Sequence, residues 1–371
     1  MKSSYLLTTA LAAALLSASC GNDTSVGHEP EINGDKVVTF TLRTPVGETV
    51  AYGRALHDGP ECTINSLVLY EYEVNDEDGT TSLTKVMKYP DGKGKDVIAL
   101  TDGGNGSYTF SITVPAENEG RKYAYRFVAN DPVAEPALGT SFDEFSSTQA
   151  DVKLALAEGA AAVGADILAD SEKGIAMSGK ALYNGSDVIT MAGGIKCEVA
   201  MTRIVSRVDI RYQTPNLRLT KVELHGAPAY GYLFPQEAIP GHEAATCLDM
   251  TLNSIHMPLT TDYLKDLDGK DTVELKKAFY LYERTNSEEN TALVHIEYEV
   301  SVNDREEPYT GSIDVPFRKT SGDKAYIDTE RNHLYTIVLG NGTDPVSGKV
   351  TAQLIIDEWN LIEIDEPIAN Y

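Results

Sequence analysis

The chain has 371 residues, with 56 Asp and Glu against 31 Lys and Arg, which gives a formal net charge of −25 at pH 7. The sequence contains no basic patch, and because nucleic-acid binding needs clustered positive charge to neutralise phosphates, no nucleic-acid partner is expected. The length exceeds what one hydrophobic core usually serves, so we expect two domains.

The first 20 residues have the pattern of an export signal that ends at a cysteine. Lys2 supplies a positive charge, residues 6–16 are a short apolar run, and Cys20 follows Ser19. This run is too short to span a bilayer, which takes about 20 residues, so residues 1–19 are predicted to be a signal peptide. We expect the Cys20 thiol to carry a lipid such as palmitate, which holds the precursor in a membrane leaflet. A plain secretory signal with a chance cysteine is the alternative.

Behind the cysteine, residues 21–34 are polar and are predicted to be a tether. Residues 37–43 then predict the first strand, because polar and apolar side chains alternate along it. One face of this strand carries its apolar side chains, Val38, Phe40 and Leu42. Residues 44–54 contain one proline and two glycines, so we expect an exposed connector that a protease can cut.

The rest of the chain predicts many short strands. Residues 65–74 predict a strand because they are rich in Leu, Val and Tyr, and residues 221–224 extend the run before them into a meander. Period-two alternation occurs in residues 108–114, 123–127, 204–212, 294–302, 313–317, 335–339 and 350–356. Asp-Gly pairs, which favour turns, lie between several of these runs. Only residues 151–170 and 254–267 predict helices, so strands do not alternate with helices and antiparallel β-sandwiches are expected. The domain boundary is predicted at Gly193 and Gly194.

No motif predicts a catalytic, metal or cofactor site, so no enzyme is expected. The seven histidines have no metal-ligand spacing, and His333 is expected to mark the start of a strand. The glycine-rich residues 102–106 precede a strand rather than a helix, which predicts a hairpin turn instead of a phosphate site. Cys62, Cys197 and Cys247 fit no zinc pattern; a disulfide between the last two is one possibility that the sequence leaves open.

Four stretches of the sequence together carry a resemblance to one family. They are the export signal ending at Cys20; residues 51–55 with 61–70; residues 201–210 with 219–224 and 231–235; and residues 280–283 with 331–335 and 357–359. In these stretches the chain resembles the fimbrillins, the type V pilus subunits of Bacteroidales bacteria. Each stretch is short, but their order and spacing span nearly the whole chain.

The resemblance implies an all-β fold with two transthyretin-like antiparallel β-sandwich domains in tandem, at residues 55–193 and 194–371. It also implies that an arginine-specific protease cuts the lipidated precursor after Arg54, so that residues 20–54 leave as a propeptide and Ala55 becomes the first residue. The first strand leaves with the propeptide, and the open groove accepts a strand from a neighbouring subunit. The implied partners are the protease, other subunits of a uniform or mixed fibre, and the outer membrane before processing.

The C-terminal end of the sequence offers a candidate for the donated strand. Ile362 and Ile364 alternate cleanly, Ile368 is in phase with them, and Leu361 falls on the opposite face. Such a strand can satisfy the backbone groups of an open sheet edge by β-augmentation. The alternative is a terminal strand of the protein's own sandwich.

The sequence therefore predicts a structural subunit of a surface pilus, or fimbrium, that supports adhesion. An anchor or a tip subunit of such a pilus is the nearest alternative. A glycan-binding surface lipoprotein is the alternative from another class, because the 20 tyrosines offer aromatic platforms. We expect the precursor in the outer membrane and the processed subunit in the fimbrium.

Overall fold

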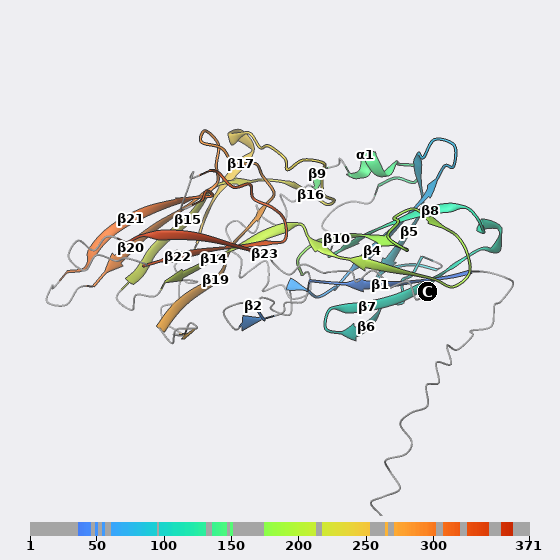
Figure 1. Ribbon diagram of the computed structural model, residues 1–371, viewed down its shortest axis with the longest axis horizontal. Coiled ribbons are helices and arrows are strands. Elements are labelled where there is room, and N and C mark those ends of the chain that lie inside the picture. The colour runs from blue at the N-terminus through green and yellow to red at the C-terminus, as the bar shows by residue number, and fades with distance from the viewer. Residues whose placement is uncertain are drawn as a thin grey trace, which may run out of the picture.

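The structure is a computed structural model that describes residues 36–45, 49–50, 54–55, 61–94, 96–130, 136–146, 149–150, 174–212, 217–252, 264–265, 271–301, 307–319, 325–340 and 350–358. In these ranges it is built almost entirely of β-strands (Figure 1). No helix within them is both long and apolar enough to cross a membrane. The predicted helix at residues 151–170 lies outside the described residues.

Ten described strands of the N-terminal half, defined here as residues 36–203, form one large sheet. The path across it is β5–β4–β8–β10–β12–β1–β7–β6, and β11 and β13 pair with β8 and β10 beside this path. The strands are β1 (Lys36–Arg43), β4 (Leu67–Val74), β5 (Thr81–Tyr89), β6 (Thr101–Gly104), β7 (Ser107–Val114), β8 (Lys122–Ala129), β10 (Met177–Leu182), β11 (Ile189–Thr190), β12 (Ile195–Ala200) and β13 (Thr202–Arg203). Helix α1 (Phe142–Ser146) and a 3-10 turn (Ala116–Asn118) lie outside the sheet.

This sheet folds back on itself into two layers around one core. Along the path, β1 and β8 are separated by β12 and β10. The centroid of the Phe40 ring on β1 nevertheless lies 5.0 Å from that of Tyr125 and 5.3 Å from that of Phe127, both on β8. The two strands therefore face each other across the core, which is the sandwich that the alternating pattern predicts.

Residues 204–358, here called the C-terminal half, form two sheets that pack face to face. One has the order β18–β19–β14–β22–β23 and the other β17–β15–β20–β21. The strands are β14 (Val205–Tyr212), β15 (Leu217–Pro228), β17 (Cys247–Thr251), β18 (Leu264–Lys265), β19 (Asp271–Tyr282), β20 (Leu293–Val300), β21 (Tyr309–Pro316), β22 (His333–Leu339) and β23 (Ala352–Glu358), and a 3-10 turn covers Ala244–Thr246. One buried cluster draws side chains from both sheets, including Val208 and Ile210 of β14 and Val294 and Ile296 of β20.

The two halves lie at opposite ends of the molecule and share an apolar interface (Figure 1). A third buried cluster combines Tyr70, Tyr72 and Val128 of the N-terminal half with Leu233, Phe234, Tyr280 and Tyr282 of the C-terminal half. Two short strands, β9 (Gln149–Ala150) and β16 (Gly231–Tyr232), also pair across the interface. Packing of this kind fixes the halves against each other.

The all-β sandwich class is confirmed, but two strand pairs differ from the antiparallel arrangement that we expected. β1 runs parallel to β12, and β14 runs parallel to β22. Alternation identifies the buried face of a strand but carries no information about its neighbour or its direction. This is why the pattern predicted β1, β14 and β22 but not the direction in which they pair.

The structure also tests the predictions for single turns, for one helix and for the cysteines. His333 begins β22, as expected. Residues 102–104 belong to β6, and Asn105 and Gly106 make the hairpin turn to β7. The end of the predicted helix at residues 254–267 is wrong, because Leu264–Lys265 form β18 and pair with β19; residues 254–263, 266 and 267 lie outside the described part. Cys197 and Cys247 carry unbridged thiols, so the possible Cys197–Cys247 disulfide is not formed.

The domain boundary stays a proposal. β12 begins at Ile195, directly after the predicted boundary at Gly193 and Gly194, and pairs with β1 and β10 of the N-terminal sheet. On that pairing we propose a later boundary, after β13 at Arg203.

Candidate functional site

β1 is an inner strand of the N-terminal sheet. It pairs antiparallel with β7 along its whole length, and parallel with β12 from Val38, opposite Ile195, to Arg43, opposite Ala200. The backbone donors and acceptors of an inner strand are bonded on both sides. Loss of β1 therefore exposes unpaired groups on two strands at once, which makes its place in the sheet a binding site for another extended segment.

The inner face of β1 fills three positions of the core. Val38, Phe40 and Leu42 are each 0% exposed. Phe40 lies between the rings of Phe110, Tyr125 and Phe127, at centroid distances of 5.2, 5.0 and 5.3 Å. Burying a side chain of this size contributes about 1.5–3 kcal/mol, so these three residues bind β1 firmly without a covalent link.

Hydrogen bonds at three successive residues hold the chain as it leaves β1. The Arg43 carbonyl accepts from the Met201 N–H at 2.9 Å, and the Thr44 N–H donates to the Gly106 carbonyl at 2.8 Å. The Pro45 carbonyl accepts from Nη2 of Arg203 at 2.9 Å. The exit from the strand is therefore fixed residue by residue.

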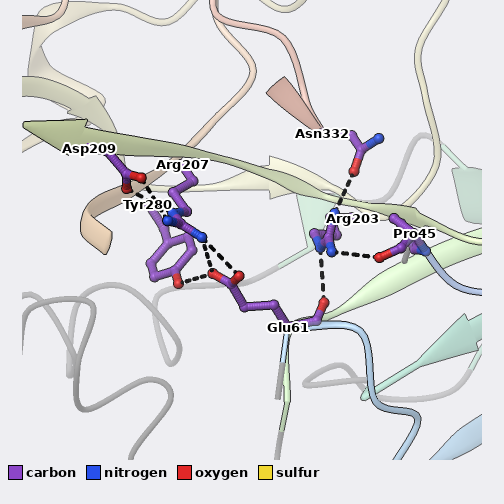
Figure 2. A network of polar contacts seen from close by, with 7 residues as sticks. All are labelled: Pro45, Glu61, Arg203, Arg207, Asp209, Tyr280 and Asn332. Carbon is purple, nitrogen blue, oxygen red and sulfur yellow. Dashed lines mark hydrogen bonds and ion pairs between the residues drawn. The ribbon is translucent and has the colours of Figure 1, made fainter. Parts of the chain in front are cut away.

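Arg203 joins this exit to two other parts of the chain. Its side chain is 0% exposed and also donates from Nε to the Glu61 carbonyl at 2.9 Å and from Nη1 to Oδ1 of Asn332 at 3.1 Å (Figure 2). Burial lowers the pKa of Arg203 to about 10, although the nearby Glu61 carboxylate opposes this. The side chain therefore stays charged at neutral pH, and each carbonyl that it binds is a charge-assisted partner.

The Glu61 side chain forms a second, adjoining network with the C-terminal half. Arg207 donates from Nη1 to Oε2 of Glu61 at 3.0 Å, and in a fork to the two carboxylate oxygens of Asp209 at 2.7 and 2.6 Å. The Tyr280 hydroxyl donates to Oε1 of Glu61 at 2.6 Å (Figure 2). Burial lowers the pKa of Arg207, but the two carboxylates outweigh it and the pKa lies above its ordinary value; burial and the Glu61 charge both raise the pKa of Tyr280.

The predicted processing residues lie on a short hairpin. The backbone of β2 (Thr49–Val50) pairs with β3 (Arg54–Ala55), with Val50 opposite Arg54. The sequence predicted an open connector here, and the pairing differs from it. A hairpin of two-residue strands has little stability of its own, so a protease that binds extended backbone has only a weak pairing to open.

The remaining predicted site residues lie outside the described part of the chain. These are Cys20 at the predicted lipidation site and Leu361, Ile362, Ile364 and Ile368 of the predicted donor strand. The nearest described element to that donor is β23, the last strand on its sheet's path, which ends at Glu358 opposite His333. The roles of Cys20 and of the four donor-strand residues stay predictions.

The two arginine networks had no functional role in the sequence interpretation. Arg203, Arg207 and Asp209 entered it only as part of the resemblance. The signal that points to them is their position in and beside β14, a strand buried on both faces along nearly all its length. Charged residues in such a strand must be paired, because an isolated buried charge is strongly unfavourable.

The sequence matches no protein-family model and no curated protein. Among solved structures, the tip fimbrial protein Mfa3 from Porphyromonas gingivalis, with a C-terminal truncation, matches with a TM-score of 0.52 and 16% identity over 88% of this chain and 100% of that chain. A candidate cell adhesion protein from Parabacteroides distasonis matches with a TM-score of 0.48 and 13% identity over 90% and 99% of the two chains. The fimbrial anchor protein Mfa2 from P. gingivalis has a TM-score of 0.36 and 10% identity over 88% and 98%.

The match to Mfa3 shows that this chain has the fold of that fimbrial protein. It agrees with the all-β sandwich class that the resemblance to the fimbrillins implied, while the two tandem domains stay a prediction.

Proposed function

We propose that this chain is a non-enzymatic structural subunit of a surface pilus that supports adhesion, exported as a lipoprotein on Cys20, cut after Arg54 and polymerised by strand exchange. One observation carries the proposal. β1, an inner strand with three fully buried side chains, lies on the N-terminal side of Arg54. A cut after Arg54 therefore converts a central strand of the sheet into a separate peptide.

The cut also explains release from the membrane. The lipid on Cys20 belongs to the same fragment as β1, so departure of that fragment frees the subunit and opens its groove together. Each buried backbone group left without a partner costs about 1–3 kcal/mol, and β7 and β12 both lose partners. The opened subunit is therefore driven to take up another strand, and a strand from a neighbouring subunit extends a fibre.

The test is to cut the detergent-solubilised precursor with an arginine-specific protease. We expect a fragment that begins at Ala55, followed by a ladder of polymers on electrophoresis without boiling. Arg54→Ala is the control and is expected to keep the chain monomeric under the same protease. A wild-type chain that loses residues 20–54 and stays monomeric would overturn the strand-exchange mechanism. Cys20→Ala is expected to abolish palmitate labelling, and unchanged labelling would overturn the lipid anchor.

A further inference from the structure

The cut after Arg54 separates the contacts of Arg203 into two groups. The Glu61 carbonyl and Oδ1 of Asn332 stay with the subunit, whereas the Pro45 carbonyl leaves with the propeptide. The adjoining network of Glu61, Arg207, Asp209 and Tyr280 contains no propeptide residue among the bonds described for it. Among the described contacts, the bond from Arg203 to the Pro45 carbonyl is therefore one that is lost when β1 departs, and the buried Arg203 lies at the end of the groove where the chain leaves β1.

The C-terminal tail repeats the pattern of β1 and its exit. Residues 40–46 are Phe-Thr-Leu-Arg-Thr-Pro-Val, and residues 362–368 are Ile-Glu-Ile-Asp-Glu-Pro-Ile. Both segments place an apolar side chain at the first and third positions, polar ones at the second, fourth and fifth, a proline at the sixth and a branched aliphatic residue at the seventh. The matching proline is Pro367, which corresponds to Pro45.

Other registers in the same direction bury charge in the groove. With Ile362 at the place of Phe40, the three buried positions of β1 receive Asn360, Ile362 and Ile364. A shift by two residues places Glu366 at the position of Leu42 in one direction and Glu358 at that of Val38 in the other, and a shift by one places Glu363 on the buried face. A buried carboxylate without a partner is far less favourable than a buried amide, so the first register is preferred.

We propose that residues 362–367 of one copy of this chain enter the groove of another in the register of residues 40–45, so that Arg203 of the acceptor binds the Pro367 carbonyl of the donor. The proposal rests on the proposed strand exchange and adds its direction, its register and the residue that anchors its end. The donor runs parallel to β12 and antiparallel to β7, as β1 does. Arg203 is a positioning residue for this contact.

The register has a direct test in a disulfide between subunits. In the uncut chain, Thr39 lies opposite Ser111 of β7, and their hydroxyl oxygens are 2.9 Å apart. The proposed register places Leu361 of the donor where Thr39 was. Chains with Leu361→Cys are mixed with chains with Ser111→Cys, cut together and analysed by non-reducing electrophoresis. Thr39→Cys with Ser111→Cys in the uncut precursor is the positive control, because a disulfide needs side chains this close.

We expect a cross-linked dimer with Leu361→Cys and at least tenfold less with Glu363→Cys, two residues away on the same face. A dimer that forms preferentially through Glu363→Cys overturns the register, while the polymer ladder of the same sample still supports strand exchange. If no ladder forms, the proposed function itself fails. The two outcomes are therefore distinguishable in one experiment.

The role of Arg203 is tested by placing the same substitution either in the acceptor chain or in the donor chain. Arg203→Lys in the chain that carries Ser111→Cys is expected to slow cross-linking at least tenfold, because the acceptor loses the fork that reaches the Pro367 carbonyl. The same substitution in the chain that carries Leu361→Cys is expected to leave the rate unchanged, because that chain only donates. Equal slowing in both positions indicates a general folding defect and overturns the anchoring role.

Discussion

At the scale of single residues, Arg207 makes the two halves of the molecule depend on a buried charge. Its guanidinium lies between Glu61, which follows the predicted processing site in the sequence, and Asp209 of β14, with N–O distances of 3.0 and 2.6 Å. All three side chains are almost completely buried. A buried ion pair adds little net stability over apolar packing, but removal of one partner leaves the other charge without compensation. Glu61 must therefore pack against Arg207 of the C-terminal half, because either charge is strongly unfavourable when it is buried without the other.

We expect Arg207→Met to lower the free energy of unfolding by about 3–5 kcal/mol, because Glu61 and Asp209 then remain buried without their cation. The matched control is Arg218→Ala, which removes the exposed pair between Arg218 and Glu299 at 3.6 Å and is expected to cost no more than about 1 kcal/mol. Urea denaturation followed by circular dichroism measures both. Equal midpoints for the two variants would contradict the importance of the network.

His242 gives the molecule a pH dependence of known sign. Its Nε2 lies 3.1 Å from the Glu283 carbonyl, and its buried Nδ1 has no hydrogen-bond partner in the described part of the chain. Burial lowers the pKa of His242 below its ordinary value of 6.5. As the pH falls below 6.5 the unfolded chain takes up this proton before the folded chain does, so the folded state loses stability. We expect His242→Gln to remove this part of the acid dependence in unfolding curves between pH 7 and 5; an unchanged slope would contradict it.

Sequence reasoning reached the residue scale only where a pattern carries the information. Alternation placed Val38, Phe40 and Leu42 on a buried face, and all three are fully buried. It gave no role to Arg203 or Glu61, because these two residues bind each other across 142 positions of the chain. Such contacts depend on which strands are neighbours, and that is set by tertiary packing.

At the scale of elements, β1 combines full integration into the sheet with a weak attachment to the chain. It has a neighbouring strand on each side. Its connection to residue 61 runs through the hairpin of β2 and β3, whose strands have two residues each. An edge strand in the same place is lost with less damage, because it has one neighbour only. Because β1 is an inner strand, its removal would leave unpaired backbone groups on two strands, and binding of another strand would pair them again.

We expect Phe40→Ala to weaken the hold on the propeptide by about 3–5 kcal/mol, because it leaves a cavity among Phe110, Tyr125 and Phe127. After the cut, release of residues 20–54 is then favoured by about two to three and a half orders of magnitude, since each 1.4 kcal/mol is about tenfold. Gel filtration with a labelled propeptide measures the release. Thr41→Ala, on the outer face of β1, is the control, and equal retention in both variants would argue against the pocket.

Many of the strands were predictable, although β5 and β19 were missed, whereas the partners of the strands were not predictable. β20 and β22 follow runs in which alternation is strong. β10 and β12 were not predicted, because β10 contains Gly179 and Lys180 and β12 is short and follows two glycines. These two strands connect β8 to β1, so without them the sequence could not show that β1 is an inner strand. The groove was therefore inferred from the resemblance and not from the pattern.

At the scale of the whole molecule, residues 231–234 lie between the two halves and contact both of them. β16 pairs with β9 of the N-terminal half. The Leu233 carbonyl accepts from the Ser178 hydroxyl at 2.5 Å and from Nη1 of Arg331 at 3.0 Å, so one carbonyl is bound by both halves. The Phe234 ring lies 5.4 Å from the ring of Phe142 on α1.

We expect the wild-type chain to unfold in a single calorimetric transition, because the apolar cluster around Phe234 makes each half stabilise the other. Phe234→Ala removes the ring that contacts Phe142 and opens a cavity in the interface, at a cost of about 3–5 kcal/mol. The halves keep their own cores around Phe40 and around Val208, so this variant is expected to unfold in two resolved transitions. Glu237→Ala, on the exposed continuation of the same segment, is the control and is expected to keep one. A single transition in Phe234→Ala at the wild-type temperature would mean that the halves are coupled elsewhere, through Arg207 and Glu61.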